Sequence, residues 1–180
     1  MSLLSIFLMD EPIRRLPHIR DLVTDVSWNY EINQHIRPLK PKPREADGTY
    51  RIQQKDIERI QEFHKCIECF LCQNVCHVMR DQQVKEFAGP RFLIRIASLA
   101  MHPLDTLNRL KELKDVFGIG YCNITKCCTE VCPEDIAITD NAIIPLKERV
   151  AGAFYDPLAW LWRSLTSVSK LSRRGFNKIS

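Results

Sequence analysis

The cysteines constrain this chain more than any other feature of its sequence. Four of them stand in the segment HKCIECFLCQNVCH with the spacing C-x2-C-x2-C-x3-C, at Cys66, Cys69, Cys72 and Cys76. Three thiolates at intervals of three residues suit one compact iron–sulfur cubane, and in two-cluster ferredoxins the fourth Cys of such a run binds the neighbouring cluster. The spacing therefore predicts a second run of cysteines elsewhere in the chain.

The second run is the segment GYCNITKCCTEVCP, with Cys122, Cys127, Cys128 and Cys132 followed by Pro133. It ends as a ferredoxin run does, in C-x3-C-P, but it begins with C-x5-C and is therefore irregular. All eight cysteines of the protein lie in these two windows. A scattered structural role would not concentrate them in this way.

Two other uses of the thiols compete with cluster binding. Disulfides need an oxidising compartment. The apolar segment LLSIFLM near the N-terminus lacks a preceding basic residue and runs directly into Asp10 and Glu11, unlike a secretory signal. Structural zinc usually takes two separated pairs of ligands around one ion, whereas the first run packs its four cysteines together. Cluster binding is the favoured interpretation, and zinc remains the alternative.

The apolar pattern predicts an all-α fold. Glycine is scarce, alternating β-branched runs are absent, and apolar residues recur at intervals of three and four. The expected helices are one that begins near Gln54 and leads into the first Cys loop, one with Pro90 in its first turn that runs to Ala100, one over 107–116 that stops at Gly118, one over 143–153, and a fifth after Pro157.

Three regions follow from composition and pattern. Residues 1–48 are an N-terminal extension and linker, in which 17–36 has a helical pattern and 38–48, with three prolines and several charges, suits an extended surface connector. Residues 49–156 are the helical domain with both Cys loops. No apolar run approaches the roughly 20 residues that cross a bilayer. The net charge of +4 comes without a basic stripe with interleaved aromatics, so a nucleic-acid partner is not indicated.

Residues 157–180 form an amphipathic, basic tail in this interpretation. Leu158, Leu161, Trp162, Leu165 and Val168 share one helical face, and basic residues follow them. Such a segment suits an interfacial helix attracted to anionic lipid or docked on a membrane subunit. A terminal helix that packs on its own domain is the alternative.

The chain resembles the iron–sulfur subunits of succinate dehydrogenase and fumarate reductase, the complex II family, over about residues 17–157. The matching segments are RDLVTDVSWNYE, KCIECFLCQNVC, AGPRFL and the C-x5-C-x3-C-P of the second run. That irregular run is the most specific of them, because generic two-cluster ferredoxins lack it. The segment GYCNITKCCTEVCPE is most similar to the corresponding segment of actinobacterial members.

The resemblance implies an α-helical ferredoxin domain in which the ligands cross between the two runs. A [4Fe-4S] cluster would be held by Cys66, Cys69, Cys72 and Cys132. A [3Fe-4S] cluster would be held by Cys76, Cys122 and Cys128. Thr125 stands where the family pattern would place a fourth ligand for the second cluster, which favours three irons. Cys127 is extra to this scheme and leaves a second [4Fe-4S] cluster open.

The resemblance also implies a function and partners. The chain would be a non-catalytic electron-relay subunit of an oxidoreductase, inactive alone, that passes single electrons between an FAD-containing flavoprotein and a membrane quinone. It would lie peripherally on the cytoplasmic side of the membrane, beside a membrane-anchor subunit, as a succinate dehydrogenase of the tricarboxylic acid cycle or as a fumarate reductase.

The sequence departs from the family pattern in two ways. There is no Cys before position 66, so we expect the plant-type [2Fe-2S] domain of the family to be lost, separately encoded or excluded by a misplaced start. His77, Asp81 and Asn123 also differ from the ubiquinone-type pattern and leave the quinone open. His77, like His64, flanks the first run, where a cluster-tuning role competes with an ordinary surface or core role.

Two alternative functions remain open at the level of sequence. One is a two-cluster subunit of another reductase, of the heterodisulfide reductase or anaerobic glycerol-3-phosphate dehydrogenase type, which needs no [2Fe-2S] domain. Such subunits have two regular Cys runs, whereas the second run here is irregular. The other is a zinc-stapled interaction or assembly protein, which metal analysis would identify.

Overall fold

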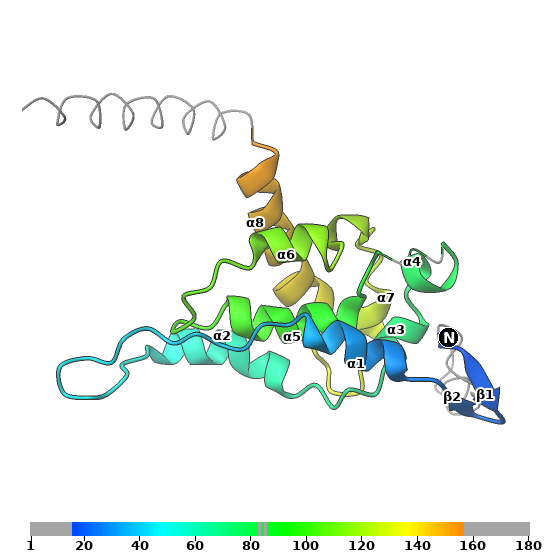
Figure 1. The fold of residues 1–180 in the computed structure, drawn as a ribbon, viewed down its shortest axis with the longest axis horizontal. Helices are drawn as coiled ribbons and strands as arrows, with labels where there is room; N and C mark the ends of the chain where they lie inside the picture. The colour runs from blue at the N-terminus through cyan, green and yellow to red at the C-terminus, as the bar shows by residue number, and fades with distance from the viewer. Residues whose placement is uncertain (1–15, 83, 85, 157–180) are drawn as a thin grey trace, which may run out of the picture.

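A computed structural model describes residues 16–82, 84 and 86–156, and within them the fold is all-α apart from one small hairpin (Figure 1). The hairpin pairs β1 with β2 in antiparallel register. The elements in chain order are β1 (His18–Arg20), β2 (Val23–Thr24), α1 (Ser27–Gln34), α2 (Gln54–His64), α3 (Leu71–Asn74), α4 (His77–Arg80), α5 (Pro90–Ala100), α6 (Leu110–Asp115), the 3-10 helix η2 (Ile119–Tyr121), α7 (Cys127–Glu130), the π-helix η3 (Ile138–Ile143) and α8 (Ile144–Phe154).

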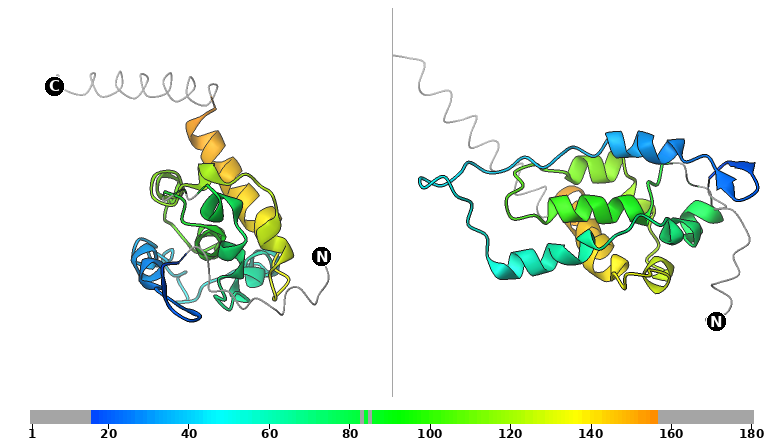
Figure 2. Two further views of the ribbon diagram at one scale, coloured as in Figure 1. Left: turned by 90° about the vertical axis from the view of Figure 1, so that its right-hand side faces the viewer. Right: turned by 90° about the horizontal axis from the view of Figure 1, so that it is seen from below.

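Helix α5 is the centre of the core. Figure 2 (right) shows it between α1 and α2, and it also packs against η3. Phe92, Leu93 and Ile96 are at most 1 % exposed, because α5 is apolar on almost every face. The ring of Trp28 from α1 meets Phe92 edge to face, with the centroids 5.6 Å apart. The central helix therefore has neighbours on several sides and positions the elements that carry the cysteines.

The start of α5 depends on Gly89 and Pro90. Pro90 occupies the first turn, where its missing N–H costs no helical hydrogen bond. Gly89 has φ +95, and a Cβ there would lie 2.4 Å from Sδ of Met79. Only glycine satisfies both the left-handed backbone and this close approach. The helix therefore begins where the sequence predicts it.

The carboxylate of Glu62 ties α2 to the end of the second Cys loop. It accepts hydrogen bonds of 2.6 Å from the backbone N–H of Ala137 and from the side chain of Asn141. Ala137 immediately precedes η3, which continues into α8, and α8 packs on α6. One acidic side chain thus joins segments that lie far apart in the sequence.

The linker is anchored to the domain by a buried ion pair. Asp105 and Arg109 are joined at 2.8 Å, and each side chain is only 2 % exposed. Arg109 also donates hydrogen bonds to the backbone carbonyls of Arg37 and Pro38, while Asp105 accepts one from the N–H of Lys40. Beyond these residues the linker forms the cyan loop of Figure 1. The expected connector, residues 38–48, is therefore extended, and its first half is hydrogen-bonded to the domain.

Two expected helices differ in extent from the structure. Residues 17–26 form the hairpin instead of a helix, because Asp25 accepts hydrogen bonds from the N–H and hydroxyl of Ser27 and so starts α1 only there. The third helix begins at Leu110 instead of 107, because the side chains of Asp105 and Asn108 bind the intervening backbone N–H groups in turns. The expected fifth helix and the amphipathic tail, residues 157–180, lie outside the described residues.

The remaining expectations for the main helices are confirmed. The helices α2, α5 and α8 lie where the apolar periodicity predicts them, to within a residue or two. Short helical turns within the Cys loops, α3, α4 and α7, were not expected from the sequence. No helix in the described part of the chain is both long and apolar enough to pass through a bilayer.

We predict that Asp105→Asn destabilises the protein by about 3 kcal/mol, because it leaves the buried guanidinium of Arg109 without its counter-charge. Burial alone would raise the pKa of Asp105, but the hydrogen bonds from Arg109, Lys40 and Leu107 hold it below the ordinary 3.8. The contribution of this pair is therefore present above pH 3.8 and is lost as the pH falls through the lower folded-state pKa.

Urea unfolding at neutral pH, followed by circular dichroism, measures this loss. The control is Asp47→Asn, whose carboxylate pairs with Arg51 on an exposed turn, where we expect no measurable change. Equal stabilities of Asp105→Asn and the unmodified protein would contradict the anchoring role of the pair.

Candidate metal centres

The two Cys loops place left-handed residues at the same positions relative to their cysteines, although the second run lacks a counterpart of Cys69. Glu68 and Phe70 have φ of +58 and +61, and Ile124 and Lys126 have φ of +59 and +61. Residues other than glycine adopt this left-handed region rarely, at a cost of roughly 1 kcal/mol or more each. A short helix follows each pair, α3 in the first loop and α7 in the second. The second run is therefore a structural repeat of the first.

This repeat aligns the cysteines of the two runs. Cys122 corresponds to Cys66, Cys128 to Cys72 and Cys132 to Cys76. Burial raises the pKa of Cys66 and of Cys122, and the backbone two residues further on, at Glu68 and at Ile124, acts in the opposite direction in both loops.

The counterpart of Cys69 in the second loop is Thr125. Its hydroxyl oxygen lies 3.4 Å from the sulfur of Cys127, the cysteine without a counterpart in the first run.

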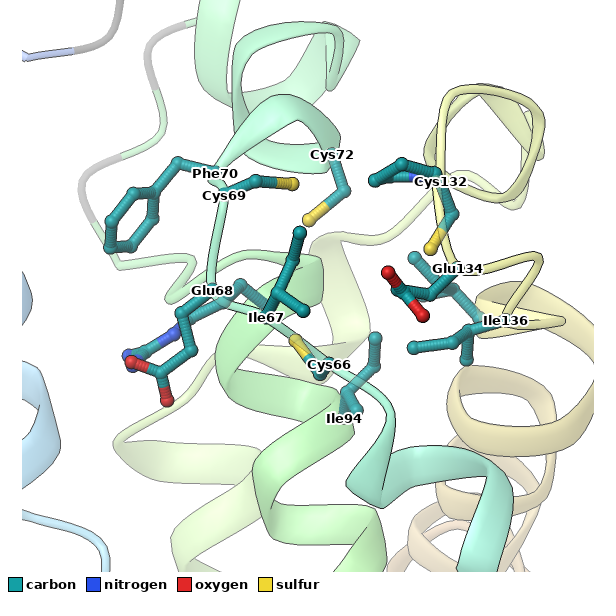
Figure 3. A pocket seen from close by; sticks show the side chains of 13 residues that line it. Cys66, Ile67, Glu68, Cys69, Phe70, Cys72, Ile94, Cys132, Glu134 and Ile136 are labelled. Carbon is teal, nitrogen blue, oxygen red and sulfur yellow. The ribbon is translucent and has the colours of Figure 1, made fainter.

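The first thiol group, namely Cys66, Cys69, Cys72 and Cys132, lines a single recess. Helices α3 and α7 pack together, and this contact brings Cys132 across to the loop of the other three. Figure 3 shows the four sulfur atoms disposed around the common space. Ile94 of α5 and Ile136 form part of its apolar wall. The cysteine of one run thus completes the site that the other run begins.

The second thiol group is Cys76, Cys122, Cys127 and Cys128. Burial raises the pKa of Cys76, Cys122 and Cys128, and the nearby charge of Cys127 raises each of them further. The backbone of Met79 and of Val78 lowers the pKa of Cys76 in part, against the larger effect of burial. The last cysteine of the first run therefore lies with those of the second run, which is the reciprocal of the placement of Cys132.

The buried thiols need a metal to become thiolates at neutral pH. Burial raises the pKa of Cys72 far above its ordinary 9.0, with further increases from Cys128 and the other thiols of the first group. Burial likewise raises the pKa of Cys128 to about 11, against a hydrogen bond with Thr139 that lowers it. Because metal ligands must be deprotonated, metal binding at these sites releases protons and offsets the cost of the buried charge.

The arrangement suits a cluster better than a single ion. A zinc ion draws four sulfurs to about 2.3 Å from one point, whereas the thiolates of a cubane each bind a different iron. Four thiols around a shared recess match the ligands of a cubane cluster.

Arg91 is the charged residue whose guanidinium lies buried beside the first thiol group. Its side chain is 3 % exposed, forms an ion pair with the carboxylate of Glu68 and lies over the rings of Phe70 and Phe92. Its charge acts on Cys66 to lower the pKa, although burial, the larger effect, raises that pKa overall. A buried guanidinium at this place balances negative charge in the recess and holds the left-handed loop.

The histidines next to the first run have different surroundings. His64 ends α2, is exposed and lines a pocket with Cys66 and Arg91. Nδ1 of His77 lies 3.0 Å from a carboxylate oxygen of Asp81, whose carboxylate also accepts two hydrogen bonds from Arg80. Those hydrogen bonds, from Arg80 first and His77 second, hold the pKa of Asp81 far below its ordinary range. Neither histidine lines the recess of the first thiol group.

Three residues with a role at the centres were not singled out from sequence. Arg91 stands in the AGPRFL segment beside Pro90, and its burial is visible only once α5 is packed. Thr139 contacts the sulfur of Cys128, and Lys147 donates a 2.6 Å hydrogen bond to the carbonyl of Cys122. The last two lie beyond the Cys runs on η3 and α8, so no local motif marks them.

Comparisons with known proteins identify related iron–sulfur proteins. Residues 62–136 match a protein family described as a 4Fe-4S dicluster domain. One of the subunits of the fumarate reductase (CoM/CoB) of Methanothermobacter marburgensis is 33 % identical over 149 residues, which cover 82 % of this chain and 29 % of that protein. The succinate dehydrogenase iron–sulfur subunit of Bacillus subtilis is 27 % identical over 140 residues, covering 73 % and 53 % respectively.

A solved structure is similar in both fold and sequence. It is described as the Mycobacterium smegmatis Sdh1 complex in the apo form, and the matched chain superposes with a TM-score of 0.76 at 60 % identity. The match covers 87 % of the present chain and 69 % of the solved one. The present chain spans about half or less of the length of the curated relatives named above.

We predict that Arg91→Gln makes the first cluster harder to reduce. The substitution removes a buried positive charge beside the first thiol group, so the reduced and more negative cluster loses stabilisation. A shift of up to about tenfold in the one-electron equilibrium, or about 59 mV, is expected. A redox titration followed by EPR spectroscopy measures it.

Arg95→Gln is the matched control, since Arg95 is one turn further along α5 and exposed. It should leave the potential unchanged. An unaltered potential in a folded Arg91→Gln protein would contradict the electrostatic role of Arg91.

Proposed function

This chain belongs to the iron–sulfur subunit family of succinate dehydrogenases and fumarate reductases, and on that premise we propose that it carries two clusters of an electron relay. Its partners would be a flavoprotein that oxidises succinate or reduces fumarate, and a membrane-anchor subunit with a quinone near the second cluster. The chain itself would bind no substrate and would lie peripherally at the cytoplasmic side of the membrane.

The observation that carries this proposal is the exchange of cysteines between the loops. Cys132 lines the recess of Cys66, Cys69 and Cys72, while Cys76 lies with Cys122 and Cys128. The first thiol group would hold a [4Fe-4S] cluster. The second would hold a [3Fe-4S] cluster on Cys76, Cys122 and Cys128, because Thr125 occupies the place that corresponds to Cys69 of the first site.

When bound, such clusters accept and release single electrons without a proton transfer step. The chain's own residues would tune this chemistry by burial, charge and hydrogen bonds to sulfur. The backbone N–H groups of Glu68 and Ile124 would donate to the thiolates of Cys66 and Cys122, and Arg91 places a positive charge beside the first thiol group. In this proposal no side chain of the recess acts as an acid or base on a substrate.

The closeness of the two thiol groups supports a relay. Cys128 of the second group acts electrostatically on Cys72 of the first, more strongly than any other thiol does. The two residues are carried by α7 and α3, which pack against each other. Two redox centres at adjoining helices would pass electrons directly from one to the other.

The crossed arrangement predicts different outcomes for two single cysteine substitutions. Cys132→Ala removes a proposed ligand of the first cluster, although Cys132 belongs to the second run. It should abolish the EPR signal of the reduced [4Fe-4S] cluster in the anaerobically purified protein. Cys127→Ala, in the same run, should keep both cluster signals and the iron content.

Several results would contradict this ligand set. One is retention of the four-iron signal in Cys132→Ala. Another is loss of the second cluster in Cys127→Ala, which would favour Cys127 as a ligand. A zinc-loaded, colourless protein without acid-labile sulfide would remove the cluster assignment altogether.

The proposed partners are tested with the complex that the chain forms in its own cells. The complex is purified anaerobically by capturing this chain. Succinate should then reduce the clusters to the extent set by their potentials. Malonate, which lacks the carbon–carbon bond that is dehydrogenated in succinate, is the control. Clusters that stay oxidised with succinate but respond to dithionite would place the chain in another reductase.

A further inference from the structure

Two threonine hydroxyl groups, one buried and one partly buried, lie beside the second thiol group. Thr139, at the start of the π-helix η3, is 1 % exposed, and its hydroxyl oxygen lies 3.3 Å from the sulfur of Cys128. The hydroxyl oxygen of Thr129, on α7, lies 3.1 Å from that of Thr139. The backbone N–H of Thr139 donates a 3.0 Å hydrogen bond to Thr129. The two threonines thus form a closed, water-poor contact beside Cys128.

The direction of the contact with sulfur follows from the ligand role of Cys128. The Thr129 oxygen accepts from the N–H of Thr139, and its hydroxyl donates to the Thr139 oxygen. Between Thr139 and the Cys128 sulfur, the geometry by itself allows either atom to donate. A metal-bound Cys128 is a thiolate, which accepts but cannot donate. With Cys128 as a ligand, the Thr139 hydroxyl is therefore the donor to sulfur.

We propose that Thr139 is a positioning residue that donates a hydrogen bond to the Cys128 sulfur, oriented by Thr129, and thereby raises the reduction potential of the second cluster. This inference rests on the proposed role of Cys128 as a ligand of that cluster. Hydrogen bonds to cluster sulfurs are among the features by which proteins set such potentials. A donor favours the reduced form because reduction adds negative charge to the sulfur ligands.

The surroundings increase the effect of this single hydrogen bond. Cys128 is 7 % exposed, and neighbouring Ile138 is 1 % exposed, so little water competes for the sulfur. In such an interior a hydrogen bond to a charged group is stronger than the same contact in water. η3 packs on α5 and α8, which holds Thr139 in place through either redox state.

The test is an EPR-monitored redox titration of the second cluster in the full chain, purified anaerobically with its native partner subunits. Thr139→Val keeps the shape of the side chain and removes the donor, whereas Thr139→Ser keeps the hydroxyl. We expect Thr139→Val to shift the one-electron equilibrium toward the oxidised form by up to about tenfold, which lowers the midpoint potential by up to about 59 mV. Thr139→Ser should stay close to the unmodified protein.

Thr106→Val is the matched control. It also removes a threonine hydroxyl, but one that donates to the backbone carbonyl of Lys40 in the linker and belongs to neither thiol group. The potential of the second cluster should not move. The proposal is overturned if Thr139→Val leaves the potential unchanged, if Thr139→Ser shifts it equally, or if Thr106→Val produces a shift of the same size.

A second variant keeps the proposal testable if Thr139→Val fails to assemble the cluster. Thr129→Val leaves Thr139 in place but removes the hydroxyl that orients it, so a smaller lowering of the potential is expected, and an unchanged potential there overturns the proposal. The unmodified protein shows whether the proposed function itself fails. If it has no EPR signal from a second cluster, the proposed function is wrong, independently of the role of Thr139.

Discussion

The exchange of one cysteine between two repeated loops is the constraint on which the rest of the structure depends. Cys132 leaves the second run to complete the first thiol group, and Cys76 leaves the first run to join the second. Neither group is complete within one loop, so α3 and α7 must be packed together before either site exists. Cluster assembly and formation of this interface are therefore expected to be coupled, as they are in other proteins whose metal ligands come from distant segments.

The loops store strain that the surrounding helices must offset. Four residues other than glycine are held in the left-handed region, two in each loop. The backbone of Glu68 and of Ile124, one in each pair, lowers the pKa of a buried cysteine, against the larger effect of burial. Strain of this kind is found where a local backbone geometry serves a site. Arg91 at one centre and Thr139 at the other supply positive charge and a hydroxyl donor from elements outside the loops.

Much of the fold follows from patterns that are local in the sequence. Helices α2, α5 and α8 are marked by apolar residues at helical spacing, and Pro90 marks the start of the central one. The hairpin before α1 and the late start of α6 could not be predicted in the same way. Both depend on Asp side chains, Asp25 and Asp105, that bind backbone N–H groups, and such turns compete with a helical pattern without changing it.

The sequence alone determined that this chain has two windows of metal-binding thiols within a helical domain. Cys spacing and apolar periodicity are both patterns among residues that lie close together in the sequence. Tertiary structure decided that the two runs place left-handed residues at equivalent positions and where Arg91 and Thr139 lie, and it brings Cys132 to the recess that the family resemblance implies for it. The physical reason is that these properties arise from packing between α3, α5, α7 and η3. Contacts between segments far apart in the chain leave no local pattern to interpret.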